Sequence, residues 1–248
     1  MYRNIPTKRI VILGNGLLGS TLHKLTGWDV ISRKEDGFDI TKPELFYKYF
    51  LECHEGVSTA SVYDVIVNCI ANTDTYSVDK NTHWDVNYKG VADLTEFCNN
   101  NSIKLVHISS DYVYTNSIAQ ASEDDVPVHG TNWYSYTKLL ADAYIELKSK
   151  NYLICRGTHK QRPFMYDRAW VDQIGNFDYV DTISEIIKQL VETQAQGVYN
   201  VGTELKSMFT LSQQTKETVP THRTADIPQD VSMNLNKLHK YLKEPFYE

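Results

Sequence analysis

Short apolar runs alternate with longer amphipathic stretches through the first 156 residues of the chain. The short runs are rich in β-branched residues, which predicts buried strands over residues 10–13, 28–32, 62–70, 105–109 and 152–155. Apolar residues recur at helical spacing between them, which predicts helices over residues 17–25, 43–53, 83–99 and 134–148. Thr41 is the predicted N-cap of the second helix, and Gly27 the predicted stop of the first. Strands that alternate with helices predict an α/β fold, a parallel sheet covered by helices on both faces.

The pattern becomes looser after Arg156. One helix is predicted over residues 183–190 and one short strand over residues 198–201. The rest of this part, which includes Pro220 and Pro228, is typical of a smaller lobe. We therefore predict a sheet domain over residues 1–156. A mixed region over residues 157–248 is predicted to form a small C-terminal lobe and to return one helix and one strand to the sheet.

Three glycines directly follow the first predicted strand, in the segment Gly14-Asn15-Gly16-Leu17-Leu18-Gly19. GxGxxG spacing between a strand and a helix is typical of a dinucleotide-binding turn. Gly14 allows the tight turn, Gly16 lets a pyrophosphate approach the backbone, and Gly19 lets the helix pack on the sheet. The free N–H groups at the helix start would bind the phosphates. The turn predicts a Rossmann-type, doubly wound sheet that binds a nicotinamide dinucleotide, the alternative being a tight turn without a ligand.

The residues that follow the second predicted strand bear on the choice of cofactor. An acidic residue there favours the ribose of NAD, whereas an arginine favours the 2′-phosphate of NADP. Here the strand ends with Ser32, Arg33 and Lys34. NADP(H) is therefore the preferred cofactor and NAD(H) the alternative, unless Arg33 and Lys34 are only solvated surface charges.

Tyr134 and Lys138 form a Tyr-x-x-x-Lys pair on the predicted helix 134–148. Positions i and i+4 share a helix face, so both side chains can point into one site. A nearby ammonium lowers the pKa of a phenol, which would make Tyr134 an acid for a ketone oxygen that receives a hydride. Such pairs also occur by chance in a chain with 17 tyrosines. Ser109 and Ser110 strengthen the interpretation, because they end a predicted strand, where a hydroxyl can reach a substrate carbonyl.

Composition excludes several other classes of protein. The net charge of −6 gives no indication of a nucleic-acid or membrane partner. The cysteines at positions 53, 69, 98 and 155 form no CxxC pair, so no zinc or redox motif is predicted, and a reducing, cytoplasmic location is expected. Residues 1–9 are polar, and the apolar run after them is too short for a signal or membrane segment. No metal site is predicted, and His107, inside a strand, is expected to be a core residue.

Several segments together resemble the extended short-chain dehydrogenase/reductase superfamily, and most closely its dTDP-4-dehydrorhamnose reductase group. They are residues 38–41, 67–73, Asn87, and residues 108–114, 134–139 and 233–238. The spacing of 24 residues between Ser110 and Tyr134 also suits this group. The resemblance implies that Ser110, Tyr134 and Lys138 are catalytic. It implies an NADP(H)-dependent reductase for the 4-keto group of a nucleotide-linked deoxysugar, and a homodimer formed through residues 83–100 and 134–148.

The turn, the strand ends and the resemblance together define the expected binding residues. Those for the cofactor are Gly14, Asn15, Gly16, Leu17, Leu18, Ser32, Arg33, Asp39, Ile40, Cys69, Ile70, Ala71, Thr73, Tyr134 and Lys138. Those for the substrate are Asp111, Tyr112 and Arg168.

The chain departs from the group at two places. Leu13 stands where the group has its first glycine, so the turn is expected to differ in shape. The stretch from Arg156 to Asp181 is shorter than in the group, and its aromatic residues either stack on a nucleotide base or simply cover the sheet edge. Two other functions stay open: an epimerase or dehydratase of the same superfamily, and a non-catalytic, NADP-binding regulatory subunit. A dehydratase commonly has a second acid beside the catalytic hydroxyl, and only Asp111 is present here.

Overall fold

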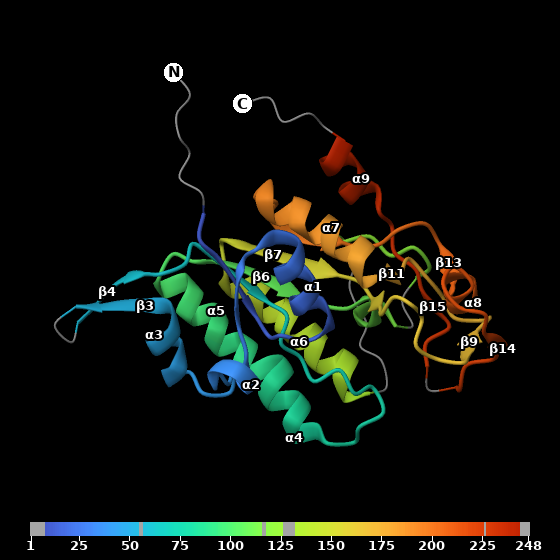
Figure 1. Cartoon of the computed structure of the whole chain (residues 1–248), viewed down its shortest axis with the longest axis horizontal. Helices are drawn as coiled ribbons and strands as arrows, with labels where there is room; N and C mark the ends of the chain where they lie inside the picture. Colours follow the sequence, from blue (N-terminus) through green and yellow to red (C-terminus); the bar gives the residue numbers. More distant parts are fainter. Residues whose placement is uncertain (1–7, 55–56, 116–117, 126–131, 226, 244–248) are drawn as a thin grey trace.

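The computed structural model describes residues 8–54, 57–115, 118–125, 132–225 and 227–243. Within these ranges the central feature is a parallel sheet of six strands in the order β12-β7-β6-β5-β1-β2 (Figure 1). The strands are β1 (Ile10–Leu13), β2 (Asp29–Ile31), β5 (Val65–Asn68), β6 (Lys104–Ile108), β7 (Tyr152–Arg156) and β12 (Gly197–Asn200). The order reverses beside β1, because β2 lies on one side of it and β5 on the other. The predicted α/β class and parallel sheet are therefore confirmed.

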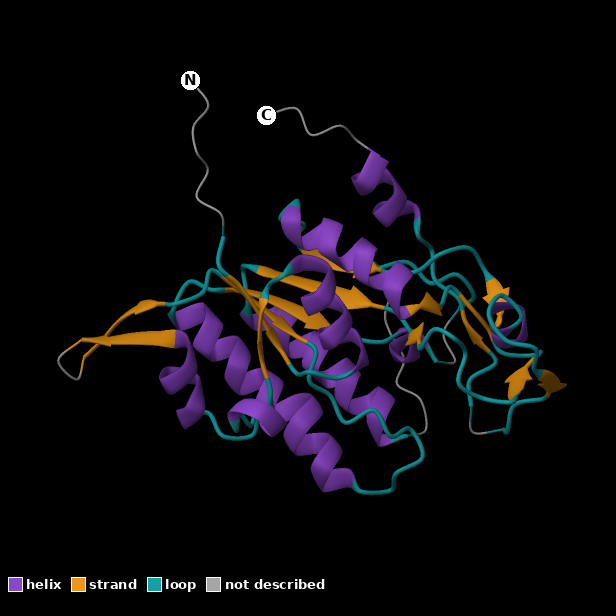
Figure 2. Ribbon diagram, in the orientation of Figure 1, coloured by secondary structure: helices purple, strands orange, loops and turns teal. Residues whose placement is uncertain are grey.

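Helices cover both faces of this sheet (Figure 2). On one face lie α5 (Gly90–Asn100) and α6 (Trp133–Lys148), which share a core with alternate strand residues such as Leu105 and Ile154. On the other face lie α1 (Leu17–Thr26), α7 (Val180–Glu192) and α9 (Asn236–Lys243), packed on the intervening strand residues such as Val106. Successive side chains of a strand point to opposite faces, so each strand contributes to both cores.

The segment between β2 and β5 differs from the prediction. The helix predicted over residues 43–53 is α3 (Glu44–Phe50), and the chain then turns into a hairpin of β3 (Leu51–His54) and β4 (Val57–Ser61). Pairing between two strands overrides the helical spacing at Leu51, a long-range effect that local periodicity does not report. The predicted strand 62–70 accordingly shortens to β5. Thr41 is not the N-cap, because its hydroxyl and amide both hydrogen-bond to Asp39 and the cap position is Pro43.

The helix predicted over residues 83–99 has three parts. It consists of α4 (Lys80–His83), a π-helical stretch η1 (Trp84–Lys89) and α5. Asp79 caps α4 through its carboxylate, which accepts hydrogen bonds from the amides of Asn81 and Thr82. Single π-helical turns often occur at functional sites. This one places Asn87 inside the protein, beside the loop that follows β5.

The chain after β7 builds small sheets beside the carboxyl ends of the main strands (Figure 1). Its strands are β8 (His159–Lys160), β9 (Arg168–Trp170), β10 (Ile174–Gly175), β11 (Asp178–Tyr179), β13 (Lys206–Ser207), β14 (Val219–Thr221) and β15 (Asp230–Val231), with helix α8 (Met208–Ser212). They enclose a separate small core that includes Phe177, Met208 and Leu211. The division at residue 156 stays a prediction. No helix in the described ranges is both long enough and apolar enough to span a membrane.

Candidate active site

A cavity of about 1160 Å³ extends from the glycine turn, past the carboxyl ends of β5 and β6, to the small sheets. This volume exceeds the roughly 300–1,000 Å³ of a site for one drug-sized molecule. The cavity lies where an open α/β sheet binds ligands, beyond the strand ends and beside the reversal in strand order. Its wall brings together eight of the predicted cofactor residues: Gly16, Leu17, Leu18, Cys69, Ala71, Thr73, Tyr134 and Lys138.

The glycine turn has the backbone shape that a phosphate-binding turn requires. Gly14 has a φ of +95°, which side chains rarely tolerate. A Cβ atom on Gly19 would come within 1.9 Å of the carbonyl oxygen of Gly14, so only glycine lets α1 start this close to the turn. A Cβ on Gly16 would meet nothing within 4 Å, because Gly16 borders the cavity. Helix α1 begins there without a side-chain cap, so its first N–H groups are available to an anion.

The remaining predicted cofactor residues lie outside the cavity wall: Gly14, Asn15, Ser32, Arg33, Asp39, Ile40 and Ile70. Ser32 is the N-cap of a short helix, α2 (Arg33–Asp36). Arg33 extends into solvent and lies 3.4 Å from Asp39. Asn15 donates its side-chain amide to Glu35, at 3.0 Å from each carboxylate oxygen. Arg33 and Glu35 thus both lie on α2, directly after β2, and Glu35 is not among the predicted cofactor residues.

Ser110 and Tyr134 line the cavity close to one another. Ser110 is the N-cap of the short 3-10 helix η2 (Asp111–Tyr114), and its hydroxyl accepts a hydrogen bond from the amide of Tyr112. Burial raises the pKa of Tyr134 to about 12, against an opposing contribution from Ser110. The expectation that Lys138 lowers the pKa of Tyr134 is therefore wrong for this structure, and the phenol keeps its proton at neutral pH.

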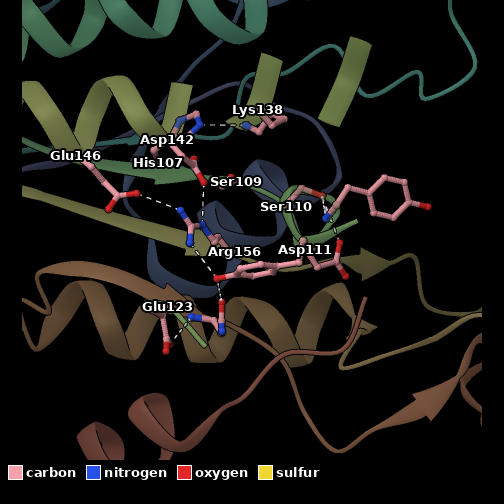
Figure 3. Close-up of polar contacts among 12 residues, drawn as sticks. His107, Ser109, Ser110, Asp111, Glu123, Lys138, Asp142, Glu146 and Arg156 are labelled. Carbon is pink, nitrogen blue, oxygen red and sulfur yellow. Dashed lines mark hydrogen bonds and ion pairs between the residues drawn. The ribbon is translucent and has the colours of Figure 1, made fainter. Parts of the chain in front are cut away.

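The amine of Lys138 is held by other groups. Its Nζ donates to the carbonyl oxygen of Ile108 at 2.6 Å and lies 3.1 Å from Nε2 of His107 (Figure 3). The side chain is buried, and burial lowers the pKa of Lys138 to about 8. Lys138 therefore joins α6 to the end of β6 and still borders the cavity.

A buried ionic network also connects α6 to the residues that follow β6 (Figure 3). Arg156 at the end of β7 donates to Asp142 of α6 at 2.9 Å, to Glu146 at 3.1 Å and to the hydroxyl of Tyr114 at 2.9 Å. Asp142 also accepts a hydrogen bond from Ser109 at 2.8 Å. Ser109 directly precedes Ser110, and Asp142 follows Lys138 by one helical turn. The network therefore helps to fix the position of Ser110 relative to Lys138.

Asn87 fixes the loop that leads from β5 along the cavity. Its side chain accepts a hydrogen bond from the amide of Asn72 at 2.7 Å and donates to the carbonyl of Asn72 at 2.9 Å. It also lies 3.3 Å from the hydroxyl of Thr137 on α6. The loop carries the predicted cofactor residues Ala71 and Thr73, so Asn87 holds them at a constant distance from the catalytic helix.

The far end of the cavity contains all three predicted substrate residues, Asp111, Tyr112 and Arg168. Asp111 is fully buried, and burial raises its pKa to about 6 although Thr158 donates a hydrogen bond to it at 2.7 Å. Gln173 donates to the hydroxyl of Tyr112 at 3.2 Å.

The wall residues that were not among the predicted site residues include Thr158, His159, Lys160 and Gln173. They lie in the shortened stretch after Arg156, where the resemblance offered no motif. Lys160 lies near Asp111, and burial lowers its pKa. No group of His, Cys, Asp and Glu side chains in the described ranges has the arrangement of a metal site.

Comparison with known proteins places this geometry in a family. The family model described as "RmlD substrate binding domain" matches residues 8–159, well over half of the chain, so the chain belongs to this family, as the sequence resemblance predicted. A search of curated proteins by sequence gives no match.

Solved structures show the same fold. A dTDP-4-dehydrorhamnose reductase from Bacillus anthracis, in complex with NADP, is 21% identical, with a TM-score of 0.76 over 96% of this chain and 93% of that chain. A hypothetical dTDP-4-dehydrorhamnose reductase from Sulfolobus tokodaii is 21% identical, with a TM-score of 0.74 over 96% of each chain. A UDP-glucuronic acid 4-epimerase from Bacillus cereus, in complex with NAD, is 18% identical, with a TM-score of 0.68 over 96% of this chain and 92% of that chain.

Proposed function

We propose that this protein is an NADP(H)-dependent reductase that acts on the keto group of a nucleotide-linked sugar, most concretely the 4-keto group of a deoxysugar. One observation supports this above all. A single cavity has a dinucleotide-binding turn at one end and Ser110, Tyr134 and Lys138 on its wall. The solved reductase from Bacillus anthracis, which has the same fold, contains NADP.

The residues at the turn fit a dinucleotide. Gly16 leaves open space beside the uncapped start of α1, which is where a pyrophosphate would lie. Arg33 is exposed and within reach of a 2′-phosphate at the end of β2, whereas Glu35 beside it would oppose one. We propose NADP(H) as the preferred cofactor and NAD(H) as the alternative.

When bound, NADPH supplies the hydride. Tyr134 gives a proton to the carbonyl oxygen, and its raised pKa keeps that proton available through the neutral range. Ser110 donates a hydrogen bond to the same oxygen and so stabilises the charge that develops on it. Lys138 holds the nicotinamide ribose, as the family resemblance implies, while Ile108 and His107 anchor its amine.

The small sheets would hold the nucleotide and sugar. Tyr112 packs edge-on against Tyr134, with ring centroids 6.1 Å apart, so a sugar bound on Tyr112 would place its carbonyl near the phenol. Arg168 is exposed at the cavity wall and could bind a diphosphate. Trp170 and Tyr166 on the same wall offer faces for a base.

A pair of tyrosine variants tests the assignment. Tyr134→Phe should abolish NADPH oxidation with a nucleotide 4-keto sugar and leave NADPH binding nearly intact. Tyr144→Phe is the matched control, because Tyr144 lies on the same helix and its hydroxyl donates a hydrogen bond to Glu96 at the surface. Turnover by Tyr134→Phe at the wild-type rate would refute the mechanism.

The same assays separate the other functions. An epimerase would retain oxidised cofactor through purification and consume no NADPH in net terms. A regulatory subunit would bind NADPH but reduce no sugar and would co-purify with a larger enzyme. We also propose a homodimer through residues 83–100 and 134–148, where Trp84 of η1 and Leu147 of α6 are exposed. Sedimentation of the purified protein measures this state.

A further inference from the structure

A buried chain of polar groups leads from the loop after β5 to the amine of Lys138. The amide N–H of Ile70 donates to Oδ1 of Asn68 at 3.1 Å. Nδ2 of Asn68 lies 3.3 Å from Nδ1 of His107, and Nε2 of His107 lies 3.1 Å from Nζ of Lys138. Asn68 and His107 are fully buried and Lys138 nearly so, which shields these contacts from water.

The direction of each hydrogen bond follows from the first. Because Oδ1 of Asn68 accepts from Ile70, the group that faces His107 is the NH₂ of Asn68, which can only donate. Nδ1 of His107 must then accept. A neutral imidazole carries its single proton on the other nitrogen, here Nε2.

We propose that Asn68 and His107 are positioning residues that hold the imidazole as the Nε2–H tautomer, so that His107 donates a hydrogen bond to the amine of Lys138. The amine in turn donates to the carbonyl of Ile108, at 2.6 Å. Every partner in the chain is then satisfied when Lys138 is neutral. When Lys138 is an ammonium, its amine can only donate. Either the Nε2–H of His107 then faces the ammonium of Lys138, or the Nδ1–H of His107 faces the NH₂ of Asn68, and in both cases two donors meet.

The surroundings agree with this assignment. Burial, and then the charge of Lys138, lower the pKa of His107 well below its usual value, so the ring is neutral and has one proton to place. Burial lowers the pKa of Lys138 to about 8 against two opposing groups, Asp142 on its own helix and Cys69 after β5. The Cys69 thiol is itself kept protonated, because burial raises its pKa to about 12.

The chain gives Lys138 a specific property. Its amine can lose and regain a proton close to neutral pH while staying fixed between β6 and α6. This property of Lys138, like the tautomer of His107, does not depend on the proposed reductase function.

The test measures the tautomer and the lysine titration without any substrate. In the free, ¹⁵N-labelled protein, long-range ¹H–¹⁵N spectra identify which nitrogen of His107 carries the proton. In ¹³C-lysine-labelled protein, the Cε signal of Lys138, assigned by its loss in Lys138→Met, reports its titration midpoint. We expect a Lys138 midpoint near 8 in the wild-type protein and, at a pH above that midpoint, the Nε2–H tautomer of His107.

Two variants of Asn68 complete the test. Asn68→Asp keeps an acceptor for Ile70 but turns the group facing His107 into an acceptor. It should switch His107 to the Nδ1–H tautomer and raise the Lys138 midpoint by at least about one pH unit. Asn68→Ala adds no charge, frees Nδ1 and should also raise the midpoint.

Thermal melting and amide spectra check that both variants are folded. An Nδ1–H tautomer in the wild-type protein, at a pH above the Lys138 midpoint, would overturn the proposal. So would an unchanged Lys138 midpoint in folded Asn68→Ala. Either result would leave the reductase function untouched, because neither measurement involves turnover.

Discussion

Two glycines of the turn have opposite roles, and alanine substitutions separate them. A Cβ on Gly19 would lie 1.9 Å from the carbonyl oxygen of Gly14 and 3.1 Å from its carbon. These are backbone atoms, so α1 must shift away from the turn. Overpacking of this kind costs about 1–3 kcal/mol or more, and the better helix propensity of alanine offsets about 1 kcal/mol of it.

Gly16→Ala should behave differently. Gly16 has an extended backbone with a φ of −78°, and its Cβ would meet no atom within 4 Å. The substitution should therefore leave the melting temperature of the free protein nearly unchanged. The added methyl group occupies the place where a pyrophosphate would approach, so NADPH binding should be lost.

Differential scanning fluorimetry with and without NADPH distinguishes the two effects. For a chain of this length, the loss of about 2 kcal/mol that remains after this offset corresponds to a melting temperature about 4–8 °C lower, which is the expectation for Gly19→Ala. NADPH at about a hundred times its dissociation constant stabilises the wild type by about 2.7 kcal/mol, or about 5–11 °C. Gly16→Ala should lose most of that increase. A full NADPH-induced increase in Gly16→Ala, or a free Gly19→Ala protein as stable as wild type, would refute the reasoning.

Three further predictions follow from the charged groups around the site. Arg156→Met leaves Asp142 buried without its partner and should lower the unfolding free energy by about 3–5 kcal/mol in urea titrations, and an unchanged urea midpoint would contradict this. Burial raises the pKa of Asp111 above its unfolded value, so its contribution to stability is present below pH 4 and disappears as pH rises through about 6. The free energy of unfolding of Asp111→Asn, measured relative to wild type, should therefore rise by about 3 kcal/mol between pH 4 and pH 7. If denaturant titrations give the same difference at both pH values, the charge of Asp111 is not buried. Arg33→Ala should weaken NADPH binding at least about tenfold and spare NADH, whereas Glu35→Gln should favour NADPH, and equal effects on both cofactors in calorimetry would remove Arg33 from the 2′-phosphate site.

Local patterns in the sequence predict the central sheet and its helices well. Strands β1, β5, β6 and β7 are short, mainly apolar runs that are almost wholly buried. Helices α1 and α6 start and end within about one residue of their predicted limits. Gly27 ends α1 in the left-handed conformation that its type allows, with a φ of +72°. These features depend on residues close together in the chain, so periodicity and end signals report them.

Features that depend on distant residues were not predicted. The hairpin of β3 and β4 needs the pairing of two strands, and η1 changes the helical phase without changing the residue types. The motif spacing correctly brought Ser110, Tyr134 and Lys138 to one cavity. It did not show that the amine of Lys138 turns toward Ile108 and His107. His107 lies on β6, far from Lys138 in the sequence, and was expected to be a core residue.

In the function that we propose, this site reduces a carbonyl carbon with hydride from NADPH. To measure this, the protein is incubated with dTDP-4-dehydrorhamnose and with NADPH that carries deuterium at the transferable position, and the nucleotide sugar is analysed by mass spectrometry. We expect one deuterium in each reduced sugar, NADP⁺ in equal amount, and neither product with Tyr134→Phe. Turnover of the sugar without deuterium uptake and without net NADPH oxidation would contradict it and indicate an epimerase.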